Sequence, residues 1–388
     1  MNNGTFVLVD HINDWSNLRP LTFTKPISHL RIGILKIYEK WELLLDSKVE
    51  IKSIQNYLKS FNTFSNKDGS IFINAAIIPT ENLVKNILAL HGGESLYANG
   101  TFIASKSGKS NFETEINYTE EFLKISFPWD IFSLNEKAIA LDFEHLTKNR
   151  QSEKLSVTNT VIGDTSNIFL EKGAKVEASI LNANGGYIYL GSNAEIMEGS
   201  VIRGSLALCE SATLKLATKI YGATTVGPHS KVGGEVSNSV IQGYSNKGHD
   251  GFLGNSVIGE WCNLGADTNN SNLKNNYGEV KSWSYGKNDY IKTGLQFLGL
   301  IMGDHSKCGI NTMFNTGTIV GVFANIFGGD FPPKHIPSFS WGGSDGFQTY
   351  QFNKAMDVAK AVMKRRSIDL SKKETEILEY IFKEETSK

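Results

Sequence analysis

The sequence predicts an α/β N-terminal domain, a parallel β-helix and a short C-terminal helical segment. Glycine distribution is the first reason, because 30 of the 37 glycines in this chain of 388 residues fall between residues 161 and 346. Over the same stretch aliphatic residues recur at every sixth position, whereas residues 347–388 contain no glycine. The composition therefore changes twice, and we place the domains at residues 1–155, 156–346 and 347–388.

Signals for strands and helices alternate along the first 155 residues. Residues 5–9 form an apolar run that predicts a strand, and further strands are expected at Ile71–Ile73 and Thr101–Ala104. A helix with one apolar face is expected over Leu30–Leu44, and another after Thr80. Strands that alternate with helices are typical of an α/β sheet.

A six-residue repeat dominates the second domain. Its repeated aliphatic or apolar positions are Leu190, Ile196, Ile202, Leu208, Leu214, Ile220, Val226 and Val232, and then Met302, Cys308, Phe314, Val320 and Ile326. Such repeats build a parallel β-helix, in which each hexapeptide forms one short face and three complete a coil. A β-sandwich with glycine turns would show a period of two instead. Glycines that follow several repeat positions are expected to supply the positive φ angles of tight corners.

The repeat changes register twice, over residues 232–258 and over residues 264–302. Each interval exceeds a multiple of six by two residues, so we expect residues to loop out of the coil in both. The first interval contains His249, and the second contains Asp267 and many asparagines. Irregular excursions from a rigid scaffold commonly carry function, which makes both intervals candidate sites.

Charged residues mark the C-terminal segment. Residues 353–388 are expected to form two helices, the second beginning at a capping box of Ser371 and Glu374. These helices would cap the end of the coil or pack on a neighbour. The basic run Lys364-Arg365-Arg366 is either a solvated helix face or a contact for the phosphates of coenzyme A.

Charge and cysteine content exclude several classes of protein. Lysine plus arginine number 39 against 40 acidic residues, so no nucleic-acid partner is expected. No apolar run is long enough to span a membrane, and the start lacks a signal-peptide pattern. The three cysteines show no metal-ligand spacing, so a metal site stays unassigned and a reducing cytoplasm is the expected location.

One segment in the β-helix resembles the acetyltransferase half of the GlmU-type bifunctional enzymes. It reads Lys-Gly-His-Asp-Gly-Phe-Leu-Gly from Lys247, then Asn-Leu-Gly-Ala-Asp from Asn263, followed by Asn272. Those enzymes acetylate glucosamine 1-phosphate and then uridylylate the product. The resemblance implies that the coil is left-handed.

The same resemblance implies a general base at His249, which takes a proton from the sugar amine as its nitrogen attacks the thioester of acetyl-CoA. An imidazole suits this role because it titrates near neutral pH. Phe252 stands where the family has a tyrosine, so the sequence supports acyl transfer better than it identifies the sugar that accepts the acyl group. The candidate substrate-binding residues are Lys247, Asp250, Asn263, Asp267 and Asn272.

The segment Leu18-Arg19-Pro20-Leu21-Thr22, followed by Lys25-Pro26, resembles the start of sugar nucleotidyltransferases. In that family the arginine and lysine neutralise phosphates next to a glycine-rich loop. No glycine follows the first strand here, although a phosphate cradle depends on close backbone approach. The nucleotide- and phosphate-binding candidates are therefore Asp10, Arg19 and Lys25, with Mg²⁺ bridging the phosphates of UTP if this site is active.

Over nearly the whole chain, the domain order and the motif at residues 303–312 (Gly-Asp-His-Ser-Lys-Cys-Gly-Ile-Asn-Thr) resemble variant GlmU-type proteins of Bacteroidetes. We expect a transferase of sugar-nucleotide biosynthesis that N-acetylates an amino-sugar phosphate with acetyl-CoA, and that transfers uridylyl if the first domain is active. The resemblance implies a homotrimer, because family sites lie between parallel β-helices. Two alternatives stay open: a sugar-1-phosphate nucleotidyltransferase with a structural β-helix, and a non-catalytic regulatory or assembly protein of the same two folds.

Overall fold

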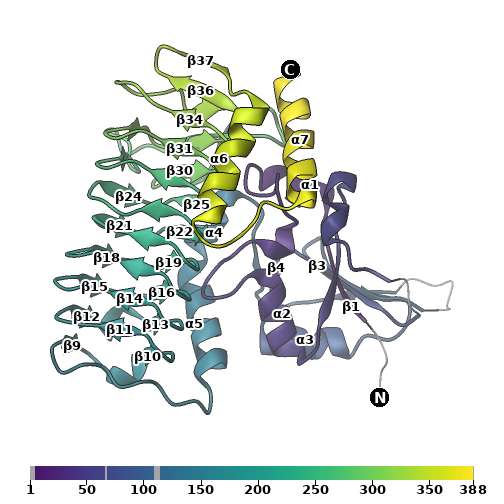
Figure 1. Cartoon of the computed structure of the whole chain (residues 1–388). Coiled ribbons are helices and arrows are strands. Elements are labelled where there is room, and N and C mark those ends of the chain that lie inside the picture. The colour runs from purple at the N-terminus through teal and green to yellow at the C-terminus, as the bar shows by residue number, and fades with distance from the viewer. Residues whose placement is uncertain (1–4, 66–67, 109–113, 388) are drawn as a thin grey trace.

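The computed structural model describes residues 5–65, 68–108 and 114–387. An α/β domain lies against one side of a long β-helix, and two C-terminal helices lie beside the upper coils (Figure 1). The predicted fold class is confirmed: a nucleotidyltransferase-like α/β domain, a left-handed parallel β-helix and C-terminal helices. The exact domain boundaries stay predictions.

The N-terminal sheet is mixed. Strand β1 pairs in parallel with β2 and β3, and β3 pairs antiparallel with β6. The order across the sheet is β2 (Val49–Lys52), β1 (Phe6–Val9), β3 (Ile71–Asn74), β6 (Thr101–Lys106), β5 (Glu94–Ala98) and β7 (Thr114–Asn117). A separate pair joins β4 (Ile77–Ile78) to β8 (Leu123–Lys124). The helical elements are α1 (Ile12–Asn17), η1 (Ile27–His29), α2 (Ile37–Leu45), η2 (Asn56–Phe61), α3 (Glu81–Leu88), α4 (Pro128–Ser133) and α5 (Asn135–Thr147).

The expected strands β1, β3 and β6 are confirmed, and so is the helix after Thr80, whose hydroxyl accepts a hydrogen bond from the Leu83 amide. The helix expected over Leu30–Leu44 is wrong in its first half, because α2 begins only at Ile37. Tertiary contacts account for the difference: the Asp142 carboxylate on α5 accepts hydrogen bonds from the amides of residues 34 and 35.

The β-helix has three parallel sheets. Sheet I contains β10 (Ile168–Leu170), β13 (Ile188–Leu190), β16 (Leu206–Leu208), β19 (Thr224–Val226), β22 (Val240–Gly243), β25 (Val257–Glu260), β30 (Leu300–Met302), β33 (Thr318–Val320) and β35 (His335–Ile336). Sheet II contains β11 (Lys175–Val176), β14 (Glu195–Ile196), β17 (Thr213–Leu214), β20 (Lys231–Val232), β23 (Asn246–Lys247), β26 (Asn263–Leu264), β31 (Lys307–Cys308), β34 (Asn325–Ile326), β36 (Ser340–Gly343) and the antiparallel β37 (Gly346–Thr349). Sheet III contains β9 (Thr160–Ile162), β12 (Ile180–Asn182), β15 (Val201–Arg203), β18 (Lys219–Tyr221), β21 (Glu235–Ser237) and β24 (Phe252–Gly254), and the pair β27 (Asn269–Asn270) and β32 (Met313–Phe314) follows.

Sheet I is buried on both faces. Its inward residues, such as Ile241 and Ile258, belong to the core of the coil. Its outward residues, such as Val240, Val257 and Ile301, belong to the same hydrophobic cluster as the core of the N-terminal domain. The two domains therefore share one continuous apolar interface rather than a flexible linker.

No residues loop out of the coil at the first change of register, so the expectation drawn from the spacing of the repeat is wrong there. Val236, Ile241, Lys247 and Leu253 all occupy inward positions and pair with the coil below. The repeat shortens instead, because Val236 comes four residues after Val232 and five before Ile241. A search for aliphatic residues at every sixth position misses this part of the ladder. Lys247 is charged, and some of the steps are shorter than six residues.

The second change of register is a true excursion, as expected. The chain leaves the coil after β27 and returns at β30, and between them it forms the antiparallel hairpin β28 (Lys281–Ser284) and β29 (Asp289–Lys292). Tyr285 at the tip of β28 contacts the N-terminal domain, where its ring lies 5.1 Å from Phe23. The excursion thus contributes to the interface between the domains.

Glycines after the ladder positions serve close packing between coils rather than positive φ. Gly191, Gly227, Gly303 and Gly321 are absent from the residues with positive φ. A Cβ at Gly191 would lie 2.6 Å from the Glu210 backbone nitrogen in the next coil. The expectation that these particular glycines turn the corners is therefore wrong; they permit backbone approach between neighbouring coils.

In the upper coils, positive φ at the corner between sheets I and II belongs to larger residues. This corner carries a stack of rings that we call the aromatic ladder, formed by His229, Tyr244, Trp261, His305, Phe323 and Phe339. The rings of Tyr244 and Trp261 lie 4.3 Å apart, and those of His305 and Phe323 lie 4.5 Å apart. Stacking of about 0.5–1.5 kcal/mol per pair offsets the cost of a left-handed backbone at non-glycine residues.

The C-terminal helices pack on this ladder. Helix α6 (Phe352–Lys364) and helix α7 (Lys372–Thr386) form a hydrophobic cluster with Phe339 and with Leu58 of the N-terminal domain. The capping box of Ser371 and Glu374 is confirmed. Within the residues that the structure describes, no helix is both long and apolar enough to cross a membrane.

Candidate active site

His249 lies at the corner between sheets II and III, directly after β23. Its side chain is exposed and borders an open cavity of about 620 Å³. Gly233, Gly234 and Gly248 form part of the wall, so one side of the cavity is backbone without side chains. Among the described residues the ring has no hydrogen-bond partner, which leaves both of its nitrogens available to a ligand.

Lys247 supports this corner from inside the coil. It occupies the ladder position above Val232, and the residue is only 3% exposed. Its ammonium group donates hydrogen bonds to the carbonyl oxygens of Gly233, at 3.0 Å, and His249, at 2.8 Å. Burial lowers the pKa of Lys247 to about 8, although the carboxylates of Asp250 and Asp267 act in the opposite direction. Lys247 thus holds the backbone of His249 from below.

Asp250 and Asp267 line the same cavity as His249. Asp267 has a positive φ of 56°, and its amide donates to the Asp250 carbonyl oxygen at 3.0 Å. Both side chains are exposed, so the cavity carries two carboxylates beside an imidazole. Lys215 also lines the cavity, so two carboxylates and one ammonium surround the approach to the imidazole, a setting that suits a polar ligand.

The other two candidates lie outside this cavity. Asn263 is on the outer face of sheet II, where its side-chain oxygen accepts a hydrogen bond from Asn246 at 3.0 Å. Asn272 lies beyond β27 and donates to the side-chain oxygen of Asn255 at 2.8 Å. The fold therefore brings together His249, Asp250 and Asp267 over Lys247, and separates Asn263 and Asn272 from them.

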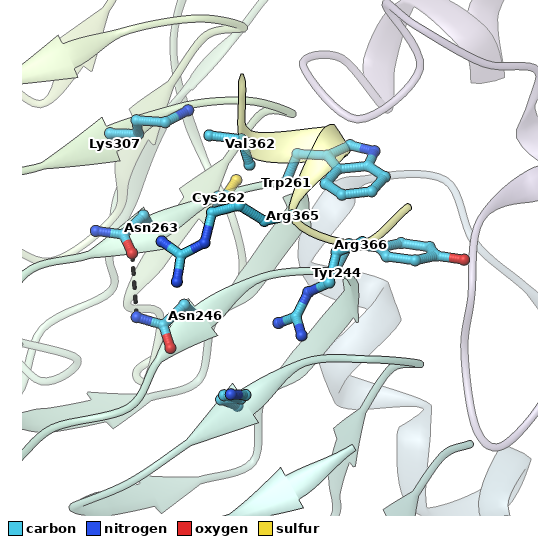
Figure 2. Close-up of a pocket in the computed structure, with 10 residues that line it drawn as sticks. Tyr244, Asn246, Trp261, Cys262, Asn263, Lys307, Val362, Arg365 and Arg366 are labelled. Carbon is cyan, nitrogen blue, oxygen red and sulfur yellow. Dashed lines mark hydrogen bonds between the residues drawn. The ribbon is translucent and has the colours of Figure 1, made fainter. Parts of the chain in front are cut away.

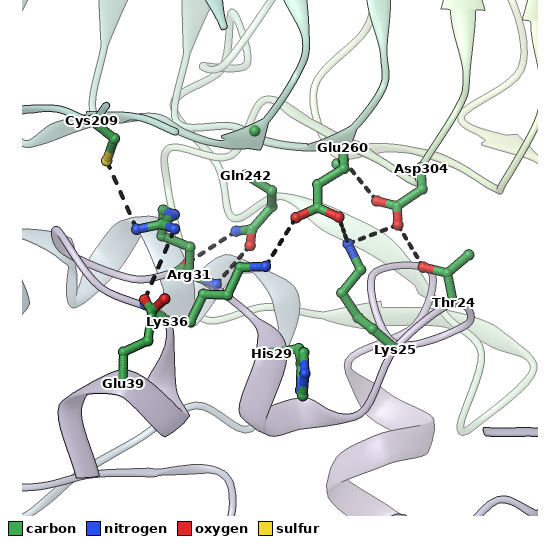
Figure 3. Close-up of polar contacts among 12 residues, drawn as sticks. Thr24, Lys25, His29, Arg31, Lys36, Glu39, Cys209, Gln242, Glu260 and Asp304 are labelled. Carbon is green, nitrogen blue, oxygen red and sulfur yellow. Dashed lines mark hydrogen bonds and ion pairs between the residues drawn. The ribbon is translucent and has the colours of Figure 1, made fainter. Parts of the chain in front are cut away.

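Lys25 faces the β-helix and borders a small cavity of about 190 Å³ between the two domains. Its ammonium lies 2.7 Å from Glu260 and 2.8 Å from Asp304, both on the β-helix (Figure 3). Lys36 joins the group at 3.4 Å from Glu260, and Thr24 donates to Asp304 at 2.5 Å. Burial alone would raise the pKa of Glu260, but Lys25 and Lys36 more than offset it and hold that pKa well below its usual range. We call these four charged side chains the interdomain ion cluster.

Arg19 is enclosed by aromatic rings. Its guanidinium carbon lies 5.1 Å from the Trp15 ring, 5.5 Å from Phe23 and 5.4 Å from Tyr285. One guanidinium nitrogen donates to the Tyr285 carbonyl oxygen at 3.1 Å. Arg19 therefore contributes cation–π and hydrogen-bond contacts to the interface with the excursion of the β-helix.

Asp10 follows β1 and is only 3% exposed. One carboxylate oxygen accepts a hydrogen bond from the Ile27 amide at 3.1 Å, and the other has no partner among the described residues. Burial raises the pKa of Asp10 to about 7. The Asp10 carboxyl is therefore enclosed within the N-terminal domain rather than presented to solvent.

Sequence reasoning missed Glu260 and Asp304, the two carboxylates of the interdomain ion cluster. Asp304 lies in the quoted motif at residues 303–312, and Glu260 ends β25, but no local pattern connects either with Lys25. They lie more than 200 positions from Lys25 in the chain, so only the tertiary structure brings them together. Across the part of the chain that the structure describes, no group of three or more His, Cys, Asp or Glu side chains is arranged to hold a metal ion.

Solved structures with some likeness to this chain are acetyltransferases or acyltransferases by title. The polySia-specific acetyltransferase NeuO is 15% identical, with a TM-score of 0.30, over 54% of this chain and 94% of that one. The UDP-N-acetylglucosamine acyltransferase of Francisella novicida is 13% identical, with a TM-score of 0.28, over 60% of this chain and 87% of that one.

Sequence comparison finds bifunctional relatives. A bifunctional sugar-1-phosphate nucleotidylyltransferase/acetyltransferase of Sulfurisphaera tokodaii is 28% identical over 55% of this chain and 47% of its own length. A bifunctional GlmU protein of Methanocaldococcus jannaschii is 34% identical over 28% of this chain and 25% of its own length. The chain thus spans about half, or less, of the length of these relatives. The model of the sugar nucleotidyl transferase family matches residues 6–151, so the α/β domain is similar to that family and stands beside a β-helix in a chain with bifunctional GlmU proteins among its sequence relatives.

Proposed function

We propose that this protein is a transferase of sugar-nucleotide biosynthesis that moves the acetyl group of acetyl-CoA to the amine of an amino-sugar phosphate such as glucosamine 1-phosphate. The observation that carries the proposal is the exposed His249 imidazole on a glycine-walled cavity, with the backbone at His249 held by the buried Lys247. Acetyltransferase names among the sequence relatives support the reaction class.

His249 acts as the general base in this proposal. Its imidazole accepts a proton from the sugar amine as the nitrogen forms a bond to the thioester carbonyl carbon. The carbon–sulfur bond then breaks. His249 is placed to return the proton that it accepted to the sulfur, and coenzyme A leaves as a thiol. Asp250 and Asp267 attract the amine end of the acceptor, and the glycine backbone leaves room for the approach.

The cavity beside His249 is open on one side, and we propose that a second β-helix of a homotrimer closes it. Leu216 lines the cavity and is 64% exposed, and Ile310 on the same corner is 69% exposed. Apolar residues at this level of exposure beside a site are typical of an interface. A monomer in light scattering at working concentration would exclude this arrangement.

The match of residues 6–151 to nucleotidyl transferases is the support for a second activity, uridylyl transfer from UTP. Lys25 and Arg19 are engaged in contacts with the β-helix, and the Asp10 carboxyl is buried. We therefore derive no uridylyl step from these residues. A domain that positions the β-helix without catalysis agrees better with their contacts, and pyrophosphate release from UTP in the presence of Mg²⁺ and a sugar 1-phosphate would contradict that assignment.

The variant His249→Ala tests the acyl-transfer proposal. We expect a loss of about 10²–10⁴-fold in the rate of thiol release from acetyl-CoA with glucosamine 1-phosphate, because that is the usual contribution of a general base. The fold should not change, since the side chain is exposed in the single chain, and the oligomeric state should not change because the proposed apolar contacts at Leu216 and Ile310 stay in place.

The control is His91→Ala, which removes another exposed histidine from the N-terminal domain. A wild-type rate for His249→Ala would exclude His249 as the base. A wild-type protein that releases no thiol with any amino-sugar phosphate would exclude the acyl-transfer reading itself.

A further inference from the structure

A second cavity, distinct from that of His249, lies between sheet II and the end of helix α6. Its volume is about 430 Å³, within the range of small-molecule sites. Tyr244 and Trp261 of the aromatic ladder form one wall, and Asn246 and Asn263 project from the strands of sheet II (Figure 2). The proton transfer assigned to His249 uses none of these side chains, although Arg365 belongs to the basic run named above as a candidate contact for the phosphates of coenzyme A.

Four cationic side chains from three separate elements line this cavity. Lys231 comes from β20 and Lys307 from β31, whereas Arg365 and Arg366 follow the end of α6. In Figure 2 the guanidinium of Arg365 reaches toward Asn246 and Asn263. No aspartate or glutamate is among the described residues of the lining, and none of the four cations forms an ion pair within the described part of the chain.

Lys307 shows that this is more than a solvated basic surface. Its side chain is half-buried, and its ammonium donates to the His305 carbonyl oxygen at 2.9 Å and lies 5.9 Å from the Phe323 ring centroid. Burial lowers the pKa of Lys307, as expected for a buried ammonium without a carboxylate partner. Like charges that converge on a partly buried cavity repel one another unless an anion is bound between them.

We propose that this cavity binds the diphosphate group of a nucleotide. A diphosphate offsets much of the positive charge of the four cations, and guanidinium groups bind phosphate oxygens in a bidentate geometry. The two asparagine amides supply further donors beside the arginines. The faces of Tyr244 and Trp261 stack on each other within the ladder, so the recognition we assign is of the phosphates and not of a base.

The diphosphate site and the His249 cavity lie at opposite edges of sheet II. Asn246 lines one and His249 the other, three residues further along the chain, which is about 10 Å of extended backbone. A bound diphosphate therefore leaves the acyl-transfer cavity free. The test measures diphosphate binding and requires no catalytic turnover. Its result therefore does not depend on whether His249 is the general base.

The test is calorimetric titration of the full chain with inorganic pyrophosphate, ADP and UDP at low salt. We expect the wild type to bind, with an affinity that falls as salt rises. Equal affinities would indicate a site for the diphosphate alone, whereas a preference for ADP or UDP would support the site and identify the nucleotide as adenosine-like or uridine-like. Arg365→Ala/Arg366→Ala should raise the dissociation constant at least tenfold.

The matched control is Lys360→Ala/Lys364→Ala, which also removes two positive charges, here from helix α6 itself. Both lysines are exposed and lie near Asp357 and Asp369, outside this cavity. Lys231→Ala tests the β-helix side separately should the double arginine variant disturb α6. No binding of any of the three ligands by the wild type, or equal loss in the arginine variant and its control, would overturn the proposal.

Discussion

Lys247 stands at a position where the coil requires an aliphatic residue. In the neighbouring coils Val232 and Leu264 occupy the equivalent inward positions. A buried ammonium costs free energy that a hydrophobic residue would not, so its presence calls for a local reason. The two carbonyl oxygens that it holds belong to the corner of His249, which is why we assign Lys247 as a positioning residue.

The variant Lys247→Met should reveal this cost through its pH dependence. The folded pKa of about 8 lies below the unfolded value of about 10.4, so between these values the unfolded chain binds more protons and stability rises with pH. The wild-type free energy of unfolding should therefore increase relative to Lys247→Met from about pH 8 to about pH 10, as measured by urea unfolding.

Lys219→Met, at an exposed position of β18, controls for the removal of one lysine. The rate of acyl transfer should fall in Lys247→Met and not in the control, because only the former releases the corner of His249. Parallel stability curves for wild type and Lys247→Met would show that Lys247 does not titrate in this range.

At the scale of elements, the coil depends on glycine where neighbouring turns approach each other. A Cβ at Gly227 would overlap the carbonyl of Gln242 in the next coil. The atom that would have to move is backbone, so the strain cannot be relieved by rotating a side chain. At the corner between sheets I and II, glycine thus lets the backbones of neighbouring coils approach each other, and the aromatic residues stack on one another.

The variant Gly227→Ala should destabilise the protein by about 1–3 kcal/mol, the usual cost of forcing extra atoms into a packed region. Gly329→Ala is the control, because a Cβ there meets nothing within 4 Å and should change stability by no more than about 0.5 kcal/mol. Thermal unfolding of the two variants measures the difference. Equal melting temperatures would show that the coils can separate to admit a methyl group.

At the scale of the whole molecule, the interdomain ion cluster connects the two domains. Lys25 and Asp304 are both about 5% exposed, so the pair is removed from water. Such a pair stabilises little relative to apolar residues, but removing one partner leaves an uncompensated charge. Lys25 therefore has a role in assembly that its place in a nucleotidyltransferase-like motif does not suggest.

The variant Lys25→Met should destabilise the protein by about 3–5 kcal/mol, because Glu260 and Asp304 lose their shared cation. Lys48→Met removes a lysine whose side chain is 90% exposed and should cost no more than about 1 kcal/mol. Urea unfolding, followed by the fluorescence of the tryptophans, checks both. A stable Lys25→Met protein that has lost a nucleotidyl activity would instead place Lys25 in a nucleotide site.

Much of the fold could be predicted because its signals are local. The six-residue ladder sets which side chains point inward, since each short strand repeats the same geometry. His249, Asp250 and Asp267 were found together because they lie on adjacent coils near one another in the chain. Leu30–Leu44 failed as a helix because contacts with α5, which lies about 100 residues away, overrode its apolar pattern.

By itself, the sequence determined that this chain forms a coil of hexapeptides beside an α/β domain, and it located the histidine of the candidate site. Only the tertiary structure decided that Lys25 and Arg19 contact the β-helix, that Lys247 points inward, and that four cations meet at the end of α6. The physical reason is distance along the chain. Periodicity acts between near neighbours, whereas the partners of buried charges come from segments up to 280 positions apart.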